Sequence, residues 1–180
     1  MRAGLTSPLP MAVDSGTLKS LIKRELECLQ DARVLGHIRE LLVEPEVVFR
    51  AWDYGKPGEK YPCWTVLEHV PSETGIAYCE YSFGPRCPWG LVWLEANEKR
   101  GCIGMDSGWY TSLLDVYFES LAAAELPIWR VFKETSSWPG EPVTEEGSWD
   151  VTWERVEQYR KEDPASRYHH HHSIAYKRCP

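Results

Sequence analysis

The hydrophobic period of this chain changes once, near Glu44-Pro45, and that change constrains the fold more than any other feature. Between Thr17 and Val43 apolar residues recur three or four positions apart, which predicts an amphipathic helical segment. From residue 46 to 105 they alternate over short runs that Gly and Pro separate, which predicts strands. A helical segment followed by consecutive strands is typical of the α+β class, and we therefore expect an α+β fold.

Local signals mark where the helical segment begins and ends. Asp14 or Ser15 can cap the first turn, because a short polar side chain accepts hydrogen bonds from the free amides there. Gly36 is a candidate break that divides the segment into two helices. Glu44 precedes Pro45 and so disfavours helical geometry, and we expect the segment to end there.

The alternating part predicts an antiparallel meander of about five strands. The clusters GKPGEK and GPRCP are typical of turns, and the loop PSETG joins two alternating runs as a hairpin loop does. The dense stretch YCEYSFGPRCPWGLVW is therefore interpreted as two strands and their turn, not as a catalytic loop. We expect strands at residues 46–55, 63–70, 76–83, 89–95 and 102–105.

Further elements follow the meander. A second helix is expected over residues 109–124, packed on the sheet, with Asp106 or Ser107 as its cap. A final strand is expected at 127–134, and a short helix at 151–163.

Composition and pattern together suggest three segments. At 180 residues the chain fits one domain with extensions. We expect a flexible N-terminus (1–13), a single α+β domain (14–135) and a polar C-terminal extension with a short helix and a His-rich tail (136–180).

The charge pattern argues against several classes of partner. The formal net charge is −7 and the Lys and Arg residues form no basic run, so nucleic acid is not expected. No apolar stretch is long enough to span a membrane, and residues 1–13 lack the apolar run of a secretory signal. We therefore expect a cytoplasmic protein that does not bind membranes and is a monomer or small homo-oligomer.

Neither the cysteines nor the histidines predict a metal or other cofactor. None of the six cysteines forms a CxxC pair, and without a secretory signal we expect reduced thiols that lie mostly in the core. The run His169 to His172 offers imidazoles that bind divalent metals opportunistically in vitro. A flexible tail supplies no fixed geometry, so no specific metal site is expected there.

Strand alternation predicts a candidate binding surface. If the loop 71–75 closes a regular hairpin, Trp64 and Glu68 share a face with Glu80 of the returning strand, and the next strand joins them in one register. A register error of one residue exchanges the two faces. The predicted partner-binding residues are Asp53, Trp64, Glu68, Glu80, Trp93 and Glu95.

These residue types favour protein recognition but leave an enzyme open. Carboxylates bind a partner's Lys and Arg, and tryptophans supply desolvated anchor area, so charge reversal at Glu68 and Glu80 is expected to weaken binding. Paired carboxylates also suit a small hydrolase or transferase, which would need a concave pocket with converging titratable groups. A third alternative is an adaptor subunit that docks on its partner through segment 136–180.

A resemblance adds to this reading. Between Tyr78 and Ser120 the order YCEYSFGP, PWGLVW and IGMDSGWYTSLLDVYFES resembles small bacterial proteins, some of which are similar to immunity proteins of contact-dependent or Rhs-type polymorphic toxin systems. The resemblance covers about a quarter of the chain. It implies a cytosolic, non-enzymatic inhibitor that binds a cognate toxin domain and blocks its active site. Binding residues do not transfer between such families, so none of the residues above is taken from it.

Overall fold

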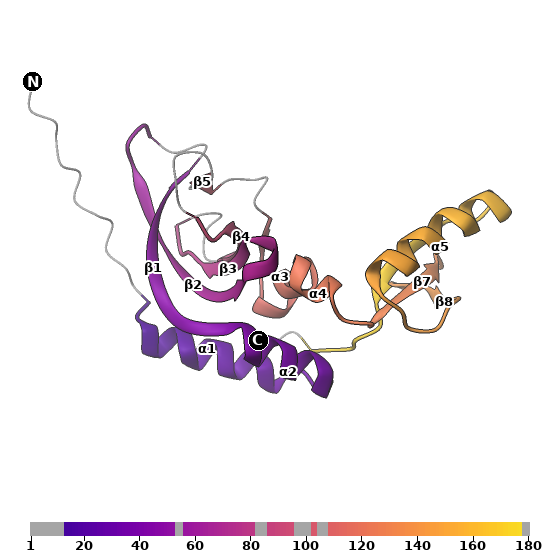
Figure 1. Cartoon of the computed structure of the whole chain (residues 1–180), viewed down its shortest axis with the longest axis horizontal. Helices are drawn as coiled ribbons and strands as arrows, with labels where there is room; N and C mark the ends of the chain where they lie inside the picture. Colours follow the sequence, from indigo (N-terminus) through magenta and orange to yellow (C-terminus); the bar gives the residue numbers. More distant parts are fainter. Residues whose placement is uncertain (1–12, 53–55, 82–85, 96–101, 104–107, 178–180) are drawn as a thin grey trace, which may run out of the picture. The chain divides into compact units, whose positions relative to one another are not determined.

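The computed structural model describes residues 13–52, 56–81, 86–95, 102–103 and 108–177 (Figure 1). The chain is α+β and divides into two compact units, Met1–Leu121 with Lys177–Pro180, and Ala122–Tyr176. The expected flexible segment 1–13 lies almost wholly outside the described residues. The division falls before the expected boundary at residue 136, because the strand near residue 130 pairs with C-terminal strands and not with the larger sheet.

Two helices open the first unit, α1 (Ser15–Glu27) and α2 (Ala32–Leu41). The expected cap is confirmed, since Asp14 Oδ1 accepts a 2.7 Å hydrogen bond from the amide of Thr17. The expected break at Gly36 is wrong. The break lies at Asp31, whose carboxylate accepts from the amides of Arg33 and Val34 and so starts a new helix.

A six-stranded sheet follows directly, and its first strand begins before the expected helix end at Glu44-Pro45. Four consecutive strands form the expected antiparallel meander, with the 3-10 turn Val70–Ser72 in the second loop. The strands are β1 (Leu42–Trp52), β2 (Lys60–His69), β3 (Thr74–Tyr78), β4 (Trp89–Trp93), β5 (Cys102–Ile103) and β6 (Trp109–Tyr110).

The edges of this sheet differ from the meander that the sequence predicts. The strand order is β5-β1-β2-β3-β4-β6, so β5 does not extend the meander beside β4 but pairs parallel to β1 at the opposite edge. Its place beside β4 is taken by β6, whose residues Trp109 and Tyr110 were expected to begin a helix.

The expected second helix is shorter and divided. It consists of α3 (Leu113–Phe118) and α4 (Leu121–Ala124), and α3 packs on the sheet against β3, β4 and β6 as expected. Ser112 caps α3 by accepting a 3.0 Å hydrogen bond from the amide of Asp115. The caps expected at Asp106 and Ser107 lie outside the described residues.

The pairing register defines the two faces of the sheet. One face carries a buried cluster that consists of Tyr61, Cys63, Ala77, Cys79 and Val92, with Trp52, Tyr81 and Trp109 packed against it. The other face carries the buried side chains of Leu67, Ile76 and Trp89.

The second unit is built on a three-stranded antiparallel sheet. Its elements are β7 (Trp129–Lys133), β8 (Glu141–Pro142), α5 (Trp149–Glu162) and β9 (Tyr168–His172), with the strand order β8-β7-β9. The expected helix near 151–163 is α5, which starts at the Ser148 cap. The expected His-rich tail is the strand β9.

The state of the cysteines differs in part from the expectation. Cys63, Cys79 and Cys87 are free thiols, and the first two are buried. Cys28 is disulfide-bonded, which differs from the expectation of reduced cysteines.

Within the described ranges, each helix is too short or too polar to cross a lipid bilayer.

Candidate functional site

A β-bulge determines where the sequence-predicted surface residues lie. Trp64 lies opposite Tyr78, as expected for one shared face. Between Thr65 and Leu67 the register shifts, so two steps along β2 match one step along β3. Every residue of β2 between the bulge and the turn therefore points to the face opposite the one that simple alternation predicts.

This shift separates the two carboxylates that motivated both the binding surface and the enzyme alternative. Glu68 lies opposite Gly75, near the turn end of the hairpin. Tyr78, the last residue of β3, lies roughly 10 Å farther along the strand, and Glu80 lies beyond it. The structure therefore does not bring Glu68 and Glu80 together.

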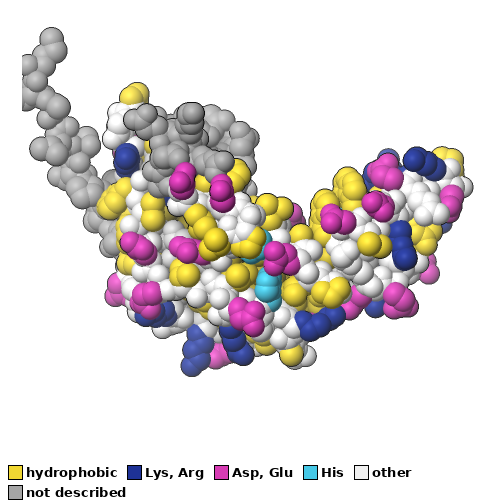
Figure 2. Space-filling view, in the orientation of Figure 1, with side chains coloured by type: hydrophobic (Ala, Val, Ile, Leu, Met, Phe, Trp, Pro, Cys, Tyr) yellow, Lys and Arg dark blue, Asp and Glu magenta, His cyan; other side chains and the backbone are white. Residues whose placement is uncertain are grey.

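The remaining predicted residues do not complete one acidic and aromatic patch. Trp93 ends β4 with 43% of its surface exposed, and Glu95 follows it as an exposed residue. Asp53 lies outside the described residues. On the face shown in Figure 2, the Asp and Glu side chains are scattered over each unit and do not merge into one patch.

The four consecutive histidines of β9 create a different surface in the second unit. Residues alternate between the faces of a strand, so the histidines divide into two pairs. His170 and His172 lie opposite Val131 and Trp129, whereas His169 and His171 lie opposite Phe132 and Arg130. The sequence shows the four imidazoles together, and the fold places them on two sides of a sheet.

The face that carries His170 is covered by α5. Val131, Val156 and Tyr168 form its buried cluster. Trp149 and Trp153 stack on each other at 5.5 Å and 3° between ring planes, and both meet the His170 ring edge-on, at 5.1 and 5.0 Å. This side of the sheet is a packed core with aromatic character.

The opposite face holds an exposed tryptophan. The Trp138 ring stacks on His169 at 4.9 Å and 5°, and meets His171 edge-on at 5.4 Å. His169 is also stacked with Phe132, at 6.1 Å and 17°. Trp138 nevertheless remains 75% exposed, the highest value among the large apolar side chains that are described as exposed. We call this surface the Trp138 platform, which consists of Arg130, Phe132, Trp138, His169 and His171.

Burial favours the neutral form of two of these histidines, His169 and His170. It lowers the pKa of His169 below the usual 6.5, and the neighbouring His171 lowers it further, while Glu134 acts in the opposite direction. Burial likewise lowers the pKa of His170. The lowered pKa of His169 favours the neutral imidazole beneath the Trp138 ring near pH 7.

Acidic side chains border the platform. Glu145 lies 3.6 Å from the guanidinium of Arg130 and is almost fully exposed. Glu134 lies 3.9 Å from Arg167. The exposed face of a Trp ring attracts the guanidinium or ammonium group of a partner, because the ring face is electron-rich. Glu145 and Glu134 are each paired with an arginine, so a partner's cation would compete with Arg130 and Arg167 for these carboxylates.

This arrangement suits binding through a pre-ordered anchor. Trp138 is held by ring contacts with two histidines, so it loses little side-chain freedom when a partner covers it. Tryptophan is also enriched among the residues that dominate binding energy at protein interfaces. Sequence reasoning missed this surface because the His run was interpreted as a tail, and four identical residues show no alternation that would have indicated a strand.

The histidines do not form a metal centre with their neighbours. Over the described part of the chain, no three His, Cys, Asp or Glu side chains come close enough to hold one ion. His171 and His172 approach each other, with ring centroids 4.1 Å apart, whereas His169 is stacked on Trp138 and His170 packs against Trp149 and Trp153.

Comparison of the chain with protein-family models, curated proteins and solved structures gave no match in any of the three.

Proposed function

We propose that this chain is a non-enzymatic inhibitor of the immunity class, which binds a basic toxin domain through the Trp138 platform. The observation that carries the proposal is the exposed Trp138 ring, fixed by His169 and His171 and bordered by carboxylates. A Lys or Arg at the partner's active site would stack on the free face of the ring. The resemblance of residues 78–120 to immunity-type proteins supports the same class.

We further propose that the chain neutralises the toxin domain in the cytoplasm. The disulfide of Cys28 makes the compartment worth testing, because structural disulfides are uncommon in the cytosol. Fractionation of the native host with an antibody to the chain would locate the protein. Recovery outside the cytosol would contradict cytoplasmic neutralisation but not binding through the platform.

The binding test compares two exposed tryptophans from different units. The full chain, Trp138→Ala and Trp93→Ala are each used to capture partners from the native host, and the captured protein is then titrated in purified form. We expect the C-terminal domain of a large secreted toxin, neutralised by the wild type. Trp138→Ala should weaken binding by about 30-fold or more, as loss of a 2 kcal/mol hot spot does.

Trp93→Ala is the matched control, since it removes a tryptophan that the sequence placed in the binding surface. It should leave the affinity unchanged. The opposite result, a loss with Trp93→Ala and none with Trp138→Ala, would return the binding surface to the large sheet. Absence of any toxin partner would contradict the immunity class itself.

A further inference from the structure

A groove of about 500 Å³ lies in the first unit, between α1, α2 and the beginning of β1. This volume falls within the range of about 300–1,000 Å³ that is typical of small-molecule sites. Its lining is predominantly apolar. The apolar part of this lining includes Ile22, Leu26, Leu29, Leu35 and Leu42.

The apolar floor follows from the helical spacing. Ile22 and Leu26 are buried side chains of α1, and Leu29 is a buried side chain just after its end; all three line the floor of the groove. Leu35 of α2 and Leu42 at the start of β1 are half-buried and complete it from the other side. The groove is therefore an apolar trough with partly exposed side chains in its wall.

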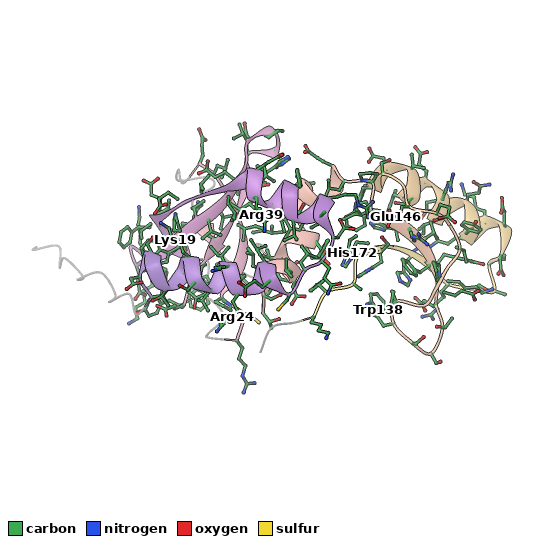
Figure 3. The ribbon with its side chains drawn as sticks, turned by 90° about the horizontal axis from the view of Figure 1, so that it is seen from below. Lys19, Arg24, Arg39, Trp138, Glu146 and His172 are labelled. Atoms are coloured by element: carbon green, nitrogen blue, oxygen red, sulfur yellow. The ribbon has the colours of Figure 1, made fainter. Side chains whose placement is uncertain are left out.

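Cationic side chains border this trough on both helices. Lys19 and Lys23 come from α1 and Arg39 comes from α2. In Figure 3, Lys19 and Arg39 lie on the sides where the two helices face each other, whereas Arg24 points away. The lining contains one carboxylate, that of Glu27.

The two helices each retain a cation that is available for a ligand. Lys19 is engaged by Glu44, 2.5 Å away. Within the described residues, neither Lys23 nor Arg39 forms a salt bridge, and both are exposed. An occupant that combines an apolar body with a negative group would bury the trough and neutralise these two charges.

We propose that this groove binds a long-chain fatty acid, with its chain on the apolar floor and its carboxylate between Lys23 and Arg39. The volume is that of a small-molecule site, and the charge of the rim selects an anion over a neutral lipid. An acidic amphipathic peptide is the alternative occupant, and the test separates it. This site is independent of the Trp138 platform, which belongs to the other unit.

The experiment is equilibrium dialysis of the full chain against radiolabelled palmitate, kept below its aggregation concentration. We expect saturable binding at one site. The double variant Lys23→Ala/Arg39→Ala should weaken it by about fivefold to tenfold, as expected for two partly exposed ion pairs. Arg24→Ala is the matched control on the same helix and should bind like the wild type.

Hexadecanol supplies the second control, because it has the same chain without the charge. Hexadecanol should bind the wild type more weakly than palmitate does. It should bind the double variant with the same affinity as it binds the wild type, because it carries no charge for Lys23 and Arg39 to neutralise. The proposal is overturned if palmitate does not saturate a site, if both variants weaken binding equally, or if hexadecanol binds as tightly as palmitate. Binding of an acidic amphipathic peptide that palmitate cannot displace would also overturn it.

The outcome is separable from the proposed inhibitor function. Trp138→Ala should retain palmitate binding, and Lys23→Ala/Arg39→Ala should retain the toxin partner. Each proposal can therefore fail without the other.

Discussion

The carboxylate of Glu25 accepts a 2.6 Å hydrogen bond from the backbone amide of Leu113, although 88 positions separate the two residues. The same oxygen lies 3.4 Å from the amide of Leu114. The first amides of a helix have no partner within the helix, so a side chain of α1 completes the cap of α3. This contact joins the N-terminal helix to the segment that follows the sheet.

Removing this cap should destabilise the first unit. We expect Glu25→Ala to lower the free energy of unfolding by about 1–2 kcal/mol, because two amides lose their acceptor. Glu25→Gln keeps an acceptor oxygen and should be at least as stable as the wild type at pH 7. Urea denaturation followed by circular dichroism measures both, with the exposed Glu40→Ala as control.

The expected stability of Glu25→Gln follows from the pKa of the Glu25 carboxyl in the wild type. Burial raises it above the usual 4.5, against the effect of the two amides. The stability that accompanies a raised carboxyl pKa is fully present below 4.5 and is lost as the pH rises through the folded pKa. The amide side chain of the Glu25→Gln variant carries no charge at pH 7 and therefore avoids that loss of stability. A Gln variant as unstable as the Ala variant would contradict this account.

Arg50 offers a test of buried charge. Its side chain is 1% exposed, and among the described residues none accepts a hydrogen bond from its three guanidinium nitrogens. We expect Arg50→Met to raise the free energy of unfolding by about 1–4 kcal/mol, because the apolar side chain removes the cost of burying the charge. The exposed Arg155→Met serves as control. A loss of stability instead would show that the guanidinium has an acceptor.

The second unit should lose stability in mild acid. Burial lowers the pKa of His169 and of His170 in the folded unit below 6.5. Below pH 6.5 the unfolded chain therefore binds more protons than the folded chain, and the stability falls until the folded pKa values are passed. The midpoint of thermal unfolding should decrease between pH 7.5 and 5.5.

Replacing these two imidazoles isolates their contribution. His169→Phe/His170→Phe keeps rings that fit a strand but removes both titrating groups, so its midpoint should depend less on pH over the same interval. An unchanged pH dependence in the double variant would assign the acid sensitivity to other groups.

Gly90 allows a tryptophan to lie on the sheet. It faces Trp109 across the β4–β6 pair, and a Cβ atom at this position would meet the Trp109 ring at 2.6 Å. Gly90→Ala should therefore destabilise the unit by about 1–3 kcal/mol, since the ring must move. The cost should shrink in a Trp109→Ala background. Equal costs in both backgrounds would exclude the ring as the cause.

Much of the first unit could be predicted from sequence because local signals decide it. Asp14 caps α1 because its short carboxylate accepts a hydrogen bond from an amide of the first turn, which is a local interaction. The turn clusters likewise mark the ends of the four meander strands. The strand β5 was expected, but its parallel pairing with β1 was not, and β6 was expected to be helical. Both strands have two residues, and the pairing of such short strands depends on the rest of the sheet. The break before α2 was misplaced because a cap at Asp31, not the flexibility of Gly36, determines it.

The binding surface was harder to predict, because one bulged residue changes it. Alternation correctly places Trp64 with Tyr78, but it does not predict the extra residue between Thr65 and Leu67 that shifts the register. The Trp138 platform depends on β7 and β9 pairing across more than thirty residues, and on a loop that returns Trp138 to that face. Neither is a local property.

The division of His169 to His172 between two sheet faces has a practical consequence for purification. Immobilised nickel retains a chain best when several imidazoles converge on one ion. In the native sheet the His170 ring is enclosed by Trp149 and Trp153 on one face, and the His169 ring is stacked on Trp138 on the other, so neither ring can turn freely toward a resin-bound ion. The unfolded segment has no such restriction. Retention on nickel resin along a urea gradient would therefore act as a built-in sensor that reports when the C-terminal sheet opens.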